Sequence, residues 1–160
     1  MTASLPEVEQ RMQPGAWDTH GFLLQGVSLA EVVARDAAKL APLGVTAAQV
    51  GQKLADVLAS GASSDWLRPF KAGVFSVEIL RRRGFITCPW APEEFQACSA
   101  AQPFAATANQ FRIVRRLSRQ HLKGFVLSSH LIQWHGFFGG PGSRFRIEPE
   151  QAVAVLGLRL

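Results

Sequence analysis

Two closely spaced helix-start signals constrain this chain more than any other feature. Ser28 and Glu31 have the spacing of a capping box, and Thr46 and Gln49 repeat it. Apolar residues at helical spacing follow each start: Leu29, Val32 and Val33 after the first, and Val50, Leu54, Val57 and Leu58 after the second. Pro42 lies between the two stretches, where a helix must end. The sequence therefore predicts two helices joined by a short connection, an N-terminal helical hairpin.

The second half of the chain predicts a small sheet. Residues 111–117 (FRIVRRL) alternate between apolar and polar side chains, and residues 144–147 (RFRI) form a second such stretch. The Gly-Gly-Pro-Gly-Ser run at 139–143 predicts a turn before the second stretch, with at least one glycine at positive φ. Residues 71–84 fit both a strand and a helix, and we favour a helix ending near Gly84. Residues 125–138 are apolar nearly all round and fit either a buried helix or a pair of strands.

These elements define the expected fold class. Pro149 is placed to begin a closing helix that ends at Gly157. We expect an α+β fold in which the helical hairpin packs on a small, mainly antiparallel sheet, built mainly from residues 109–147, with the closing helix at the C-terminus. Residues 1–15 are polar and contain two prolines, so we expect a flexible tail followed by a single globular domain over 16–160.

The sequence also gives expectations about the cellular compartment. No apolar run approaches the ~20 residues of a membrane-spanning helix, so no membrane partner is expected. The first fifteen residues contain no apolar signal core, which predicts a cytoplasmic protein with reduced thiols. Cys88 and Cys98 lie ten positions apart, a spacing that matches no common zinc or redox motif. We interpret both as buried thiols and expect no cofactor.

The charge distribution suggests a binding function. The net charge is +5, yet no Asp or Glu occurs between Glu94 and Glu148. The six cations expected to contact a polyanion all lie in that interval: Arg112, Arg116, Arg119, Lys123, Arg144 and Arg146. Guanidinium groups bind phosphate in a bidentate manner and stack on bases. We therefore expect a non-enzymatic binding module for nucleic acid or another polyanion such as an acidic protein. The same arginines also fit a solvated face or partners for acids elsewhere in the chain.

Two further functions remain as alternatives. The first is a small enzyme with a pocket formed by His130, His135 and Cys88, in which an imidazole and a thiol form a reactive pair. A spacing of five places the two histidines ~140° apart on a helix. We therefore expect no metal site from them. The second is a protein-interaction or assembly module, and a homodimer is compatible with every alternative.

The turn at residues 139–143 gives a more local expectation. Phe145 and Ile147 would take the inner face of the following strand. Arg144 and Arg146 would then lie on its outer face and be available to a ligand.

Overall fold

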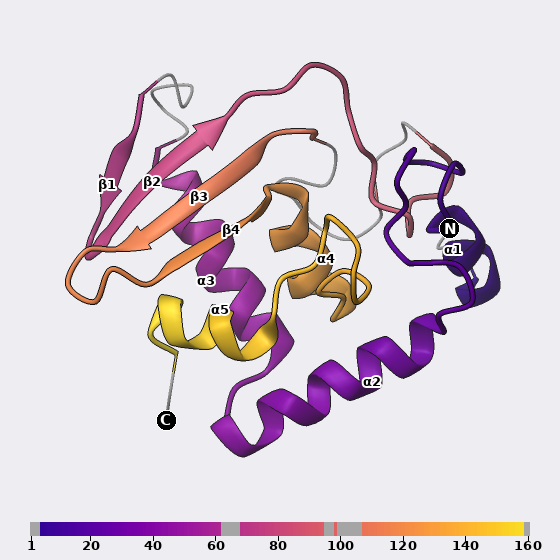
Figure 1. Ribbon diagram of the computed structural model, residues 1–160, viewed down its shortest axis with the longest axis horizontal. Helices are drawn as coiled ribbons and strands as arrows, with labels where there is room; N and C mark the ends of the chain where they lie inside the picture. Colours follow the sequence, from indigo (N-terminus) through magenta and orange to yellow (C-terminus); the bar gives the residue numbers. More distant parts are fainter. Residues whose placement is uncertain (1–3, 62–67, 95–97, 99–106, 159–160) are drawn as a thin grey trace.

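The computed structural model describes residues 4–61, 68–94, 98 and 107–158 of the 160-residue chain. In this part of the chain, a four-stranded antiparallel sheet combines with helices at both ends of the sequence (Figure 1). The α-helices are α1 (Leu5–Arg11), α2 (Leu29–Leu40), α3 (Ala47–Ala59), α4 (Leu127–His135) and α5 (Pro149–Leu156). The strands are β1 (Phe70–Ala72), β2 (Phe75–Leu80), β3 (Gln110–Arg115) and β4 (His121–Phe125). The predicted α+β class with a closing C-terminal helix is confirmed.

Both helices predicted for the N-terminal half form, as α2 and α3, with a short connection between them. The Ser28 hydroxyl accepts a hydrogen bond from the Glu31 amide at the start of α2. Thr46 and Gln49 form a reciprocal capping box at the start of α3. A 3₁₀ turn (Ala41–Leu43) ends at Gly44, which has a left-handed φ of 70°. Glycine adopts this angle without a Cβ penalty, so the chain changes direction there between the helices.

The sheet follows the order β1-β2-β3-β4, and every neighbouring pair is antiparallel. Half of it comes from residues 70–80, so the helix favoured for 71–84 is wrong. Buried and more exposed residues alternate along β2, and its buried side chains Phe75, Val77 and Ile79 face the core. Both the helical and the alternating pattern were present in this segment. Pairing with β3 over six residues decided the outcome, because tertiary context overrides local propensity.

The strand predicted for residues 144–147 does not form, and β4 is the last strand of the sheet along the described chain. Residues 144 and 145 lie in a turn. One backbone hydrogen bond, from the Ile147 amide to the Phe138 carbonyl, connects this segment to the chain that precedes the glycine-rich turn. The prediction of positive φ in the preceding turn is confirmed, at 85° for Gly139 and 81° for Gly142. A Cβ on Gly139 would lie 2.4 Å from the Phe145 carbonyl oxygen, so the loop closes too tightly for another residue.

Two hydrophobic clusters share α4. The first joins the inner face of the sheet to α3 and α5 and includes Ile132 of α4. The second joins α4 to α1, the start of α2 and the connection between β2 and β3, and includes Leu131 of α4. In Figure 1, α4 lies between the sheet and the N-terminal segment. A residue on α4 can therefore face either the sheet or the long connection.

The first residues of the chain contribute to the second cluster. Within the segment expected to be a flexible tail, Leu5–Arg11 form α1, and Ser4 caps its first turn. Val8 of α1 and the next residue after the helix, Met12, are fully buried. This segment packs against the region that holds the two cysteines. Among the described residues, no helix combines the length and apolar character needed to cross a membrane.

Candidate metal centre

Helix α4 supplies two histidines to one site. His130 is 1% exposed, and His135 is the last residue of the helix before Gly136, whose φ of 65° ends it. Their ring centroids lie 5.3 Å apart in an edge-to-face arrangement. The expectation that a spacing of five keeps them apart is wrong. It considered only the direction in which each Cβ leaves the helix, whereas the imidazole rings extend well beyond Cβ and meet.

The connection between β2 and β3 supplies two cysteines. Cys88 and Cys98 are both buried in the second hydrophobic cluster, close to the histidines. The Nε2 atom of His135 lies 3.4 Å from Cys88 Sγ and 3.6 Å from Cys98 Sγ. One ligand atom from each of Cys88, Cys98, His130 and His135 lies within 4.8 Å of every other. We call these four residues the Cys-His cluster.

A tight turn orients Cys88. The Ala91 amide donates a hydrogen bond to the Cys88 carbonyl oxygen at 3.0 Å. The backbone amides of Trp90 and Ala91 also donate to the Cys88 sulfur. Backbone N–H groups aimed at a sulfur stabilise its thiolate form. The turn therefore provides part of the environment that a thiolate ligand needs.

Arg11 of α1 holds this turn from outside. Its Nη1 atom donates to the carbonyl oxygens of Pro89, at 2.9 Å, and Ala91, at 2.6 Å. Its Nη2 atom donates to the Pro92 carbonyl at 3.0 Å. Three hydrogen bonds from one rigid guanidinium fix the path of the chain immediately after Cys88. This is the structural role of the N-terminal helix.

Trp90 fixes the ring of His135. The two rings stack with centroids 4.2 Å apart and planes that differ by 2°. Trp90 is itself buried, so the imidazole has little freedom to rotate. This stacking holds the Nε2 atom of His135 toward the sulfurs, as a preformed ligand site requires.

His130 is the poorly satisfied member of the cluster in the described part of the chain. Both ring nitrogens of His130 are buried there without a hydrogen-bond partner. A buried unsatisfied donor or acceptor costs about 1–3 kcal/mol. Burial raises the pKa of the Cys88 thiol, and the hydrogen bond with Cys98 raises it further. A cation bound among these groups would favour the thiolate form of Cys88 and give His130 a partner.

The two sulfur–nitrogen distances to His135 match those around one tetrahedral ion. Zinc bonds of about 2.3 Å to sulfur and 2.0–2.1 Å to nitrogen, set at the tetrahedral angle, separate a sulfur from a nitrogen by roughly 3.6 Å. The two sulfur–nitrogen distances to His135 are 3.4 and 3.6 Å. In a two-iron cluster with mixed ligands, cysteines and histidines bind different irons. The short distances here place both residue types around one point.

The cations expected to bind a polyanion divide into groups. Arg112 and Lys123 are exposed and face each other in register across β3 and β4. Arg144 pairs with Asp18 at 2.5 Å and lies beside them in one groove. Arg116 and Arg119 are exposed near the β3–β4 turn, where Arg116 donates to the Gly73 carbonyl.

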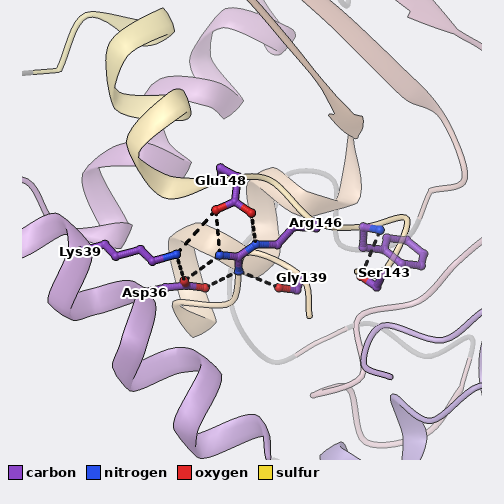
Figure 2. Close-up of polar contacts among 7 residues, drawn as sticks. Asp36, Lys39, Gly139, Ser143, Arg146 and Glu148 are labelled. Carbon is purple, nitrogen blue, oxygen red and sulfur yellow. Dashed lines mark hydrogen bonds and ion pairs between the residues drawn. The ribbon is translucent and has the colours of Figure 1, made fainter. Parts of the chain in front are cut away.

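Arg146 is a structural residue. Its side chain is 10% exposed, so its expected place on an outer face is wrong. Figure 2 shows its guanidinium between Asp36 of α2 and Glu148, which precedes α5. It donates to both Asp36 carboxylate oxygens, at 2.6 and 2.9 Å, and to the Gly139 carbonyl at 3.0 Å. Burial alone would lower the pKa of Arg146, but the hydrogen bonds to Asp36 and Glu148 raise it.

Sequence reasoning singled out Cys88, His130 and His135 but missed Cys98 as their partner. One signal was available, because the histidine pair has the H-x₃₋₅-H spacing of common zinc sites. The cysteine spacing gave none, since the chain between Cys88 and Cys98 is longer than in a zinc-finger knuckle. Arg11 and Trp90 carried no signal at all, because their roles depend on which distant segments pack together.

Comparisons of the chain with protein-family models, with curated proteins and with solved structures give no match. The interpretation of the Cys-His cluster therefore depends on its geometry and chemistry.

Proposed function

We propose that this protein binds one zinc ion at the Cys-His cluster and uses it to hold the β2–β3 connection against α4. The observation that carries the proposal is the convergence of two sulfur and two imidazole ligands from distant segments in a buried place. Two cysteines and two histidines are a common ligand set for structural zinc. Imidazole and thiolate together also suit zinc better than the hard cations magnesium and calcium.

Charge balance supports an ion at this point. Two thiolates with two neutral imidazoles carry a charge of about −2, which one Zn²⁺ neutralises. A neutral centre is the form that a buried site tolerates, because isolated buried charges are very costly. Binding would also release the thiol protons that burial retains at Cys88. An ion bound to His130 would give one of its nitrogens a partner.

The ligand count favours a structural role over catalysis. Catalytic zinc keeps a fourth position for water or substrate, whereas four protein ligands close the tetrahedron. Cys88, Cys98 and His130 are buried, and Trp90 covers His135. The enzyme alternative with Cys88 as a nucleophile is disfavoured for the same reason, since a nucleophile must reach its substrate.

The test begins with the metal content of the purified protein. We expect one equivalent of zinc per chain by mass spectrometry of metals. Replacement by Co²⁺ should give the strong visible absorption of a tetrahedral ion and the ultraviolet band of cobalt–thiolate bonds. Cys98→Ser should remove part of the thiolate band, and His130→Asn should lower the affinity. His121→Asn is the matched control, because His121 is exposed on β4.

The outcome that contradicts the proposal is equally clear. A folded protein without bound zinc that shows no tetrahedral cobalt spectrum after reconstitution would reject a metal centre. A cobalt spectrum that survives in Cys98→Ser and His130→Asn unchanged would place the ion elsewhere. Circular dichroism of each variant separates loss of a ligand from loss of the fold.

A further inference from the structure

A groove with basic walls runs from the sheet to the residues that follow β2. One part, of about 530 Å³, is lined by residues of β2, β3 and β4 together with Arg144 and the mostly buried Arg146. The adjoining part is lined by residues 82–86, Asp18 and Arg144. Gln110, Phe125 and Arg144 line both parts, so they are continuous. We call the whole the basic groove.

The cations of the basic groove outnumber its acids. Arg112 and Lys123 line one part, and Arg82 and Arg83 line the other. All four are exposed: Arg82, Arg83, Arg112 and Lys123. The acids on the walls are Glu78 and Asp18, and Asp18 is already paired with Arg144. A concave surface with excess positive charge concentrates anionic ligands.

An exposed aromatic side chain lies at one end of this surface. Phe85 lines the basic groove and is 69% exposed, although most phenylalanines of the described chain are buried. Leu80, at the end of β2, is also exposed in the groove. A flat apolar ring among arginines is what a nucleobase needs for stacking. An acidic peptide would use the cations but gain less from the ring.

We propose that the basic groove binds single-stranded nucleic acid, with phosphates on Arg112, Lys123 and Arg82 and a base on Phe85. The path of the groove from the sheet to residues 82–86 gives an extended chain successive cations and then an aromatic surface. Single-strand binding proteins combine a positive groove with stacking side chains in this way. The proposal does not depend on the metal, since none of these residues belongs to the Cys-His cluster.

The first experiment measures affinity against salt. A fluorescently labelled single-stranded oligonucleotide should bind at low ionic strength, with a log–log slope of roughly −0.7 per phosphate neutralised. The double variant Arg112→Gln/Lys123→Gln should weaken binding and reduce the slope by about 1.4, as for two lost phosphate contacts. Arg35→Gln/Lys53→Gln is the matched control, because it removes the same charge from α2 and α3, outside the groove.

The second experiment distinguishes nucleic acid from any polyanion. Phe85→Ala should weaken oligonucleotide binding about 10-fold. It should leave binding of dextran sulfate or polyglutamate unchanged, because those polymers have no base to stack. Leu117→Ala is the control, since Leu117 is 89% exposed but lies outside the groove near the β3–β4 turn.

Several results would overturn the proposal. Absence of oligonucleotide binding at low salt would reject it, as would equal weakening by the Arg35 and Lys53 control. Tighter binding of polyglutamate than of the oligonucleotide, with no effect of Phe85→Ala, would show that the groove serves an acidic protein. All the substituted residues except the half-buried Lys53 are exposed, and melting temperatures close to wild type would confirm that the variants fold.

Discussion

The buried polar groups around Arg146 and those around His130 differ in where their partners come from. Around Arg146, the chain itself supplies the matching groups: both oxygens of Asp36, the Glu148 carboxylate and the Gly139 carbonyl (Figure 2). Around His130, the described residues supply no hydrogen bond to either ring nitrogen. The hydrogen bonds within the first region account for its buried charges without a ligand. For the second, a bound ion would supply a partner that the described residues do not, and this is why we propose the ligand there.

The largest expected effect is removal of the metal. Zinc sites add their binding free energy to folding, so a strong chelator should destabilise the protein by several kcal/mol. Cys88→Ala should show the same loss without chelator and little further change with it. Arg146→Met should be less stable than wild type, yet lose the same further amount on chelation. Thermal unfolding with and without chelator measures all three effects. A wild-type melting temperature that does not change with chelator would contradict the proposal that a metal stabilises the Cys-His cluster.

The next effect concerns the buried ion pair between Arg146 and Asp36. Asp36→Ala leaves the buried Arg146 without its bidentate partner, and we expect a loss of about 3 kcal/mol. The value lies at the low end because Glu148 still accepts from Arg146. The double variant Asp36→Leu/Arg146→Met should recover much of the loss, because two apolar side chains leave no unpaired charge. Chemical denaturation measures both, and a double variant as unstable as the single one would refute this interpretation.

A smaller effect tests how the Cys-His cluster is positioned. Arg11→Gln removes the guanidinium that binds three carbonyls around Cys88, without changing any metal ligand. We expect zinc affinity to fall about 10-fold, as for other residues that orient ligands. Competition with a chromophoric chelator measures the affinity. Arg35→Gln, with the same change at an exposed position of α2, should retain wild-type affinity.

The smallest effect is a pH dependence in the Arg146 region. The hydrogen bond from Arg146 lowers the pKa of Glu148, and the charges of Arg146 and Lys39 act in the same direction. Because the folded pKa is below the ordinary value of 4.5, this contribution is present above that value. It is lost as the pH falls through the folded pKa. We expect less than about 1 kcal/mol, since the carboxylate is half exposed and solvent screens it.

Melting temperatures of wild type and Glu148→Gln measured from neutral to acid pH test this sign. The difference between them should be present at pH 7 and shrink toward acid. Glu150→Gln is the charge-matched control on α5. A difference that grows on acidification would contradict the assignment.

The sequence predicted the parts of the fold that depend on neighbouring residues. Both caps of the helical hairpin and the C-terminal helix from Pro149 were readable because capping and proline rules act within one turn. Residues 71–84 were not readable, because the choice between helix and strand depended on β3, some thirty residues away. For the same reason Arg146 was mistaken for a surface cation, since its partner Asp36 lies on α2, more than a hundred residues earlier in the sequence.

The site shows the same division between local and distant information. The spacing of His130 and His135 was a local signal and fits a zinc ligand pair. The contribution of Cys98 and the support from Arg11 arise only after the β2–β3 connection has packed between α1 and α4. The charge excess of the C-terminal third was also readable. The distinction between an exposed cation such as Arg112 and a buried, ion-paired one such as Arg146 was not readable.

X-ray absorption at the zinc edge of the purified, unmodified protein tests the central claim most directly, because it reports the ligands around the ion without any substitution. The account predicts two sulfur neighbours at about 2.3 Å and two nitrogen neighbours at about 2.0–2.1 Å, with imidazole scattering beyond them. Bound zinc surrounded by oxygen atoms alone, or by sulfur without imidazole, would show that Cys88, Cys98, His130 and His135 do not hold one ion together.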